Sequence, residues 1–115
     1  MKKMLIMIAG PYRSGTKTTE EQQLNLIALN KVAFEVFKKG HIPVIGVNLA
    51  LPIIEVAGEE FYSDIMMPLS LAIAEKCDAV LRIGGESKGA DEEMNLIKSI
   101  DGTIFQSLDD IPISK

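Results

Sequence analysis

The feature that most constrains the fold is the apolar run Met4–Ala9, which Gly10-Pro11 ends at once. An unbroken apolar run of this length is typical of a strand covered on both faces, as in a parallel sheet. It is far shorter than the roughly 18 residues of a membrane span. The Gly-Pro break also distinguishes it from the start of a signal peptide. We therefore expect a buried strand here, within a parallel sheet.

Helical and strand patterns alternate in the rest of the sequence. Thr18-Thr19-Glu20-Glu21 has the form of a capping box, in which side chains satisfy the free amides at a helix start. The helix should end near Lys39, because Gly40 suits the left-handed conformation that follows a helix. Apolar residues at helical spacing predict its buried stripe: Leu26, Leu29, Ala33, Val36 and Phe37, widened by Leu24, Ile27 and Ala28.

Residues 46–62 show no clear period and contain Pro52 and Gly58, so we expect a functional loop with a short helix. A helix ending near Lys76 follows, with Pro68 in its first turn or at a kink. The other predicted elements are strands at 42–45, 79–83 and 103–105 and a helix from Ala90 to about Ile100.

This alternation predicts a three-layer αβα domain spanning residues 1–115, with a parallel sheet of four, or at most five, strands. Right-handed crossovers favour the flavodoxin- or Rossmann-like order 2-1-3-4. Ligands bind such sheets at the carboxyl ends of the two strands that flank the reversal in strand order. Here these are the first and third strands, so the expected crevice lies between residues 10–17 and 84–90.

Composition excludes several classes of function. A net charge of −4 provides no basic surface, so we expect no nucleic-acid partner. With one cysteine and one histidine, the 115 residues offer neither a disulfide nor a zinc site, and no metal or organic cofactor is implied. No run is long enough for a membrane span, so we expect no membrane partner and a cytoplasmic location.

The first loop, residues 10–18, precedes a helix and combines small residues, hydroxyls and two cations. Backbone amides at a helix start favour an anion, and Arg13 or Lys17 can add a charged contact. The alternative is a solvated turn that binds nothing. The spacing Gly10-x-x-x-x-Gly15 is close to a P-loop, but Thr16 displaces the lysine that must reach the phosphates, so we reject that reading.

The second loop leads into three acids, Asp91-Glu92-Glu93. Acids in a first helical turn interact favourably with the helix dipole, which explains all three as solvated residues. In the functional interpretation, Ser87-x-Gly89-Ala90-x-x-Glu93 places Glu93 directly above the crevice. A carboxylate there can attack an anomeric carbon or stabilise an oxocarbenium-like centre, as glycosyl transfer requires.

Four segments, in order, resemble the nucleoside 2-deoxyribosyltransferase-like superfamily: Ala9-Gly10-Pro11-Tyr12, Cys77-Asp78-Ala79-Val80, Ser87-Lys88-Gly89-Ala90-Asp91-Glu92-Glu93 and Ser107-Leu108-Asp109-Asp110-Ile111-Pro112. The chain is most similar to a small branch with Ala-Gly-Pro near the start and Ser-x-Gly-Ala-x-x-Glu near the end. The resemblance implies that Glu93 forms a covalent deoxyribosyl intermediate. It implies contacts to the nucleoside or its phosphate, and with the crevice it gives these binding candidates: Gly10, Pro11, Tyr12, Arg13, Ser14, Ser87, Gly89 and Ala90.

Two positions depart from the family pattern. The catalytic aspartate of the family falls at Ser70, and the tyrosine that orients the glutamate falls at Met7. Protonating the leaving base then needs another acid, such as Asp64 or a residue of a neighbouring subunit.

The leading hypothesis is an enzyme that transfers or hydrolyses the N-glycosidic bond of a nucleoside or its monophosphate. The alternatives are a non-catalytic nucleotide-binding protein and an oligomeric scaffold. By the same resemblance we expect at least a homodimer, with contacts in residues 46–70.

Overall fold

Four parallel strands form the centre of the molecule, in the order β2-β1-β3-β4. The computed structural model describes residues 2–114, and within them the sheet has the smaller of the two predicted sizes. The three-layer α/β fold and the strand order are both confirmed. The strands are β1 (Leu5–Ala9), β2 (Ile42–Val44), β3 (Ala79–Arg82) and β4 (Thr103–Phe105).

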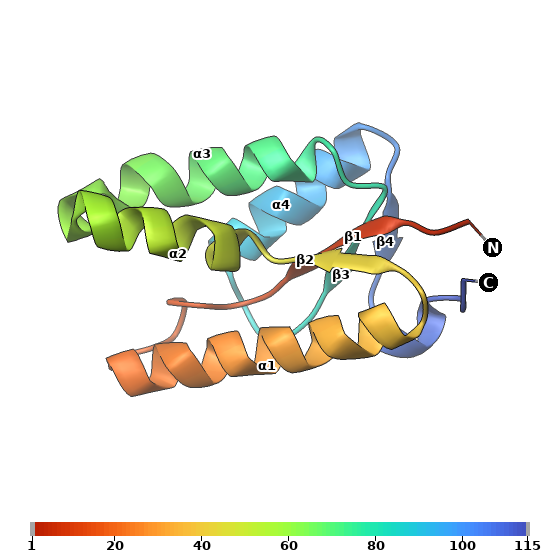
Figure 1. Cartoon of the computed structure of the whole chain (residues 1–115), viewed down its shortest axis with the longest axis horizontal. Helices are drawn as coiled ribbons and strands as arrows, with labels where there is room; N and C mark the ends of the chain where they lie inside the picture. Colours follow the sequence, from red (N-terminus) through yellow and green to blue (C-terminus); the bar gives the residue numbers. More distant parts are fainter. Residues whose placement is uncertain (1, 115) are drawn as a thin grey trace.

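Helix α1 (Thr19–Lys38) covers one face of the sheet, and α4 (Lys88–Ser99) covers the other together with α3 (Tyr62–Ala74) (Figure 1). Helix α2 (Gly46–Ala57) packs mainly on α3. Successive residues of β1 enter opposite cores, which explains the unbroken apolar run. The core on the α1 face includes Ile6, Ile8, Leu29, Val36 and Leu81, and the core on the α4 face includes Met7, Ala9, Ala74, Val80 and Ile97.

Thr18 caps the start of α1, as predicted, while the Glu21 carboxylate accepts from the Lys17 amide rather than the Thr18 amide. The Thr18 hydroxyl accepts a hydrogen bond from the Glu21 amide at 3.1 Å, and Gly40 after the helix has a φ of +92°. The predicted buried stripe is too wide, because a single helix over a sheet buries only the side chains that point straight at it. Four of its predicted members are exposed: Leu24, Ile27, Ala28 and Phe37.

The prediction of a functional loop at 46–62 is wrong, because α2 fills most of it as a twelve-residue helix. A 3-10 turn, η1 (Glu59–Phe61), joins α2 to α3. Pro52 and Pro68 lie inside α2 and α3, and both side chains are exposed. A proline inside a helix costs about 3 kcal/mol, and burial of apolar side chains between the two helices offsets it. In Figure 1 this helical hairpin extends beyond the carboxyl ends of the strands.

Two sets of polar contacts, one through Asp78 and one through His41, stabilise the opposite end of the sheet. The Asp78 carboxylate accepts a hydrogen bond from the Leu5 amide at 2.8 Å, so this side chain has a structural role. His41 is fully buried and is a core residue. Its Nδ1 accepts from the Met4 amide at 3.1 Å, and with the proton on Nε2 the ring donates to the Pro112 carbonyl at 2.7 Å.

Candidate functional site

The loops after β1 and β3 lie side by side, as the strand order predicts. The Ile83 amide donates to the Ala9 carbonyl at 2.9 Å, which continues the pairing of the two strands into the loops. Gly10 permits this approach: a Cβ there would lie 2.8 Å from the Leu29 Cδ2 and 3.0 Å from the Ile83 carbonyl oxygen. A larger residue at this position would push the two loops apart.

A cavity of about 190 Å³ lies between these loops and the α2–α3 hairpin, and we call it the Glu93 cavity. Eight of the nine predicted site residues line it; the exception is Pro11, which lines a neighbouring cavity instead. The lining residues are Gly10, Tyr12, Arg13, Ser14, Val47, Tyr62, Met66, Met67, Ser70, Ser87, Gly89, Ala90 and Glu93.

Sequence reasoning missed the wall that α2 and α3 contribute. Its residues Val47, Tyr62, Met66 and Met67 are not among the predicted site residues. No chemical motif marks these residues. The one available signal was the apolar character of residues 46–57, which favours a helix over a loop.

Glu93 enters the cavity from the first turns of α4. The helix begins two residues earlier than predicted, because Ser87 caps it and accepts a hydrogen bond from the Ala90 amide at 3.1 Å. The Glu93 side chain is buried, and this burial raises the pKa of its carboxyl group from 4.5 to about 7. Arg82 opposes the shift and Glu92 adds to it. Among the residues that line the cavity, Glu93 is the only acid.

The three acids of α4 have different surroundings. Asp91 is exposed and accepts a hydrogen bond from the Arg82 Nε at 3.0 Å. Arg82 also donates to the Gly85 carbonyl at 2.9 Å, so this pair holds the second loop in place. The interpretation that all three acids are solvated residues is therefore wrong for Glu93.

Ser70, where the resemblance would place a catalytic aspartate, lines the same cavity and is buried. Gly46 brings it close to Glu93: a Cβ on Gly46 would lie 2.8 Å from the Ser70 Cβ and 3.1 Å from the Glu93 Oε2. The Ser70 hydroxyl can donate a hydrogen bond, but it cannot protonate a leaving base as a carboxylic acid would.

The remaining candidates for chemistry lie elsewhere. Met7 is fully buried in the sheet core and does not line the cavity. Asp64 is exposed and also lies outside the lining. Cys77 is buried, and burial raises the pKa of its thiol to about 11, so it is not a thiolate nucleophile at neutral pH.

Arg13 also lines the cavity and contacts Tyr62 and Glu59. Its guanidinium carbon lies 3.5 Å from the centre of the Tyr62 ring, and one terminal nitrogen donates to the Glu59 carboxylate. The Arg13 Nε is buried and has no hydrogen-bond acceptor within residues 2–114. Burial raises the pKa of the Tyr62 phenol, although Arg13 opposes the shift, so the ring is neutral.

The Arg13 contacts hold its side chain only weakly. An ion pair between exposed groups stabilises by about 0–1 kcal/mol, whereas a buried, unpaired N–H costs about 1–3 kcal/mol. Arg13 also separates the Glu93 cavity from a groove of about 400 Å³, to which both Arg13 and Glu59 contribute. We call this the Glu59 groove; its other lining residues are Tyr12, Thr19, Gln22, Leu51, Ile54 and Glu55.

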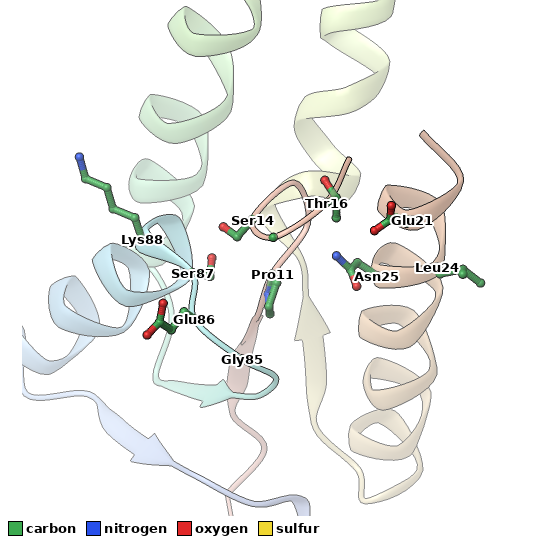
Figure 2. A pocket seen from close by; sticks show the side chains of 11 residues that line it. Pro11, Ser14, Thr16, Glu21, Leu24, Asn25, Gly85, Glu86, Ser87 and Lys88 are labelled. Atoms are coloured by element: carbon green, nitrogen blue, oxygen red, sulfur yellow. The ribbon is translucent and has the colours of Figure 1, made fainter. Parts of the chain in front are cut away.

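A larger cavity of about 640 Å³ opens on the other side of the first loop (Figure 2), and we call it the outer cavity. Ser14 and Ser87 line both it and the Glu93 cavity. Figure 2 shows Pro11 between the two serines and the side chains of α1. The Lys88 side chain extends away from the two serines. The Asn25 amide donates to the Tyr12 carbonyl at 2.9 Å and so ties the first loop to α1.

Two further properties bear on function. Within residues 2–114, no group of three or more His, Cys, Asp or Glu side chains is placed to hold a metal ion. In the same range, no helix combines the length and apolarity needed to cross a membrane.

A scan against models of protein families finds no match, and a search of curated proteins finds no significant relative.

Proposed function

We propose that the Glu93 cavity binds the sugar of a nucleoside or nucleoside monophosphate, and that Glu93 cleaves its N-glycosidic bond. A Glu93 oxygen forms a bond to the anomeric carbon as the carbon–nitrogen bond breaks. The base leaves with the bonding electron pair and takes up a proton from water, because Glu93 is the only acid among the lining residues. A second base, or water, then attacks the same carbon and releases Glu93.

The observation that supports this proposal best is the buried carboxyl group of Glu93 in a cavity at the reversal of strand order. Burial leaves the carboxylate poorly solvated and raises its pKa to about 7, so a large fraction is ionised at neutral pH. A poorly solvated carboxylate next to a ligand is suited to stabilising, or bonding to, a developing positive charge on a sugar carbon.

The sizes of the cavities support a ligand whose sugar, base and phosphate occupy different spaces. Binding pockets for small molecules span about 300–1,000 Å³, and the Glu93 cavity alone, at about 190 Å³, is below that range. The Glu93 cavity suits a sugar, and adjoining spaces offer room for a base or a phosphate. Arg13, Ser14, Ser87 and Gly89 are the candidates for the phosphate, as the resemblance implies.

The first test is base release from deoxynucleosides and deoxynucleoside monophosphates, followed by chromatography with and without an acceptor base. Base release by the natural protein should be lost in Glu93→Gln, which keeps the shape but cannot form the bond. Glu92→Gln is the matched control, because it removes a neighbouring charge outside the cavity and should retain activity. Release that persists in Glu93→Gln excludes Glu93 as the nucleophile.

The pH dependence of the reaction gives a second test. The nucleophile must be ionised, and burial raises the Glu93 pKa to about 7. The rate at low substrate concentration should therefore rise with pH up to about 7 and level off above it. A rate that falls over the same interval would assign Glu93 the role of an acid instead.

Ser70 favours a second candidate function, nucleotide binding without cleavage. In that position it leaves the cavity with no acid besides Glu93 to protonate the leaving base. The discriminating result is stabilisation without base release: a ligand at 100 times its dissociation constant raises stability by about 2.7 kcal/mol. If no nucleotide raises the melting temperature, the remaining interpretation is an oligomeric scaffold that binds no nucleotide.

We also infer a homodimer or higher homo-oligomer, with α2 at the contact. Three apolar side chains on the outer side of α2 support this: Leu49, Ile53 and Val56 are 42%, 47% and 90% exposed. Apolar groups gathered on one exposed surface are typical of an interface.

A further inference from the structure

The two tyrosines of the chain, Tyr12 and Tyr62, both line the Glu93 cavity, and only the Tyr62 ring has a planar group stacked on it. That group is the Arg13 guanidinium, 3.5 Å from the ring centre. A flat aromatic ligand would stack on a face of the same ring, with ring centres about 4.5–7 Å apart. The guanidinium therefore occupies the position that a nucleobase would take on this ring.

The Arg13 side chain can leave this position while its backbone stays in place. The Arg13 carbonyl accepts hydrogen bonds from the Thr16 amide at 3.1 Å and from the Thr16 hydroxyl at 2.6 Å, which fix the turn. The side-chain contacts are weaker: the Glu59 side chain is 68% exposed, and the buried Arg13 Nε lacks an acceptor within residues 2–114. Moving outward would give that Nε access to water.

The position of Arg13 also determines the shape of the site. Arg13 lines both the Glu93 cavity and the Glu59 groove. Displacement of its side chain would join the two spaces beside the Tyr62 ring. A nucleoside could then place its sugar next to Glu93 and its base on Tyr62.

We propose that Arg13 is a displaceable cover on Tyr62, and that the base of the ligand replaces its guanidinium on the ring. When the base enters, the Arg13 side chain moves outward. Its ion pair with Glu59 either moves with it or breaks. Glu59 thereby tunes affinity, because its ion pair with Arg13 holds the cover in place. The inference takes its ligand class, a nucleoside or nucleotide, from the proposed function.

Tyr62 can be observed directly. The chain has two tyrosines and no tryptophan, so Tyr12→Phe leaves Tyr62 as the only tyrosine. Titration of this variant with 2′-deoxyadenosine 5′-monophosphate should shift the Tyr62 ring protons upfield in NMR spectra. Deoxyribose 5-phosphate, which lacks a base, is the control and should leave them unshifted. Nucleotide binding that shifts the Gly89 and Ala90 amides but leaves the Tyr62 ring unchanged would overturn the proposal, as would no binding at all.

Affinity for neutral 2′-deoxyadenosine tests the cover without any phosphate contact. Tyr62→Leu should weaken binding about tenfold or more, because it removes the stacking surface, while Tyr62→Phe should retain it. Glu59→Gln should strengthen binding by up to about fivefold, because it loosens the cover. Glu60→Gln, at an exposed position in the same turn, is the matched control and should have no effect. Unchanged binding in Tyr62→Leu, or weaker binding in Glu59→Gln, contradicts the proposal.

The base-release assay distinguishes the proposed enzyme activity from the proposed role of Arg13 as a cover on Tyr62. Stacking on Tyr62 without base release supports the cover and contradicts the enzyme. Base release that depends on Glu93 but not on Tyr62 supports the enzyme and contradicts the cover.

Discussion

Replacement of Glu93 by glutamine is expected to stabilise the protein at pH 8 by as much as about 3 kcal/mol and to have little effect at pH 4. Burial raises the pKa of the Glu93 carboxyl group from 4.5 to about 7 in the folded protein. Each unit of pKa difference corresponds to about 1.36 kcal/mol. Glutamine has nearly the same shape and carries no charge, so it avoids the cost of a buried carboxylate.

The direction of this effect follows from proton binding. Below pH 4.5 both the folded and the unfolded chain hold the proton, and the charge plays no part. Between pH 4.5 and about 7 the unfolded chain has released the proton while the folded protein retains it. Stability therefore falls as pH rises through this interval, and above it the full cost of the buried charge is present.

Urea unfolding at pH 4, 6 and 8 measures the difference between the natural protein and Glu93→Gln. The control is Glu92→Gln, which removes one negative charge from the same part of α4 and should change stability by less than about 0.5 kcal/mol. An equal effect of Glu93→Gln at pH 4 and pH 8 would show that the charge is not responsible. A gain at pH 8 together with lost activity would show that Glu93 is retained for function rather than for stability.

Truncation of His41 to alanine is expected to destabilise the protein by about 3–5 kcal/mol. The imidazole is fully buried and joins the Met4 amide to the Pro112 carbonyl. Its removal leaves a cavity and two unpaired backbone groups. Domains of this size are stable by only about 5–15 kcal/mol, so the variant should lose a large part of its stability.

The urea midpoint of His41→Ala measures this loss against Lys39→Ala. Lys39 also bonds the C-terminal segment, through its Nζ and the Ile111 carbonyl at 2.9 Å, but its side chain is only partly buried. Lys39→Ala should therefore cost less than about 1 kcal/mol. Similar losses in the two variants would contradict the view that burial of the imidazole is what stabilises the segment.

The sheet could be predicted because its determinants are local and strong. Met4–Ala9 is apolar throughout because β1 is central and packs on both faces, and Gly10 and Gly40 mark where a strand and a helix end. The handedness of parallel connections then leaves few possible strand orders. The crevice followed from the strand order, so its two loops were identified without any knowledge of side-chain contacts.

The rest of the site depends on contacts that sequence patterns do not encode. Tyr62 and Val47 reach the cavity only because α2 and α3 pack as a hairpin beyond the sheet, and two internal prolines obscured that hairpin. The stacking of Arg13 on Tyr62 joins residues 49 positions apart in the chain. Likewise, helical spacing alone could not decide that Glu93 is buried while Asp91 bonds Arg82 at the surface.

The central position of β1 has a consequence for the order of folding. β1 pairs with β2 and with β3, and the bond from the Leu5 amide to Asp78 spans 73 positions of the chain. The centre of the sheet therefore cannot close until a long stretch of polypeptide has been made, and contacts of such separation slow folding. During synthesis, β1 would therefore have one unpaired edge until β3 has been made, and its apolar side chains would remain partly exposed until then.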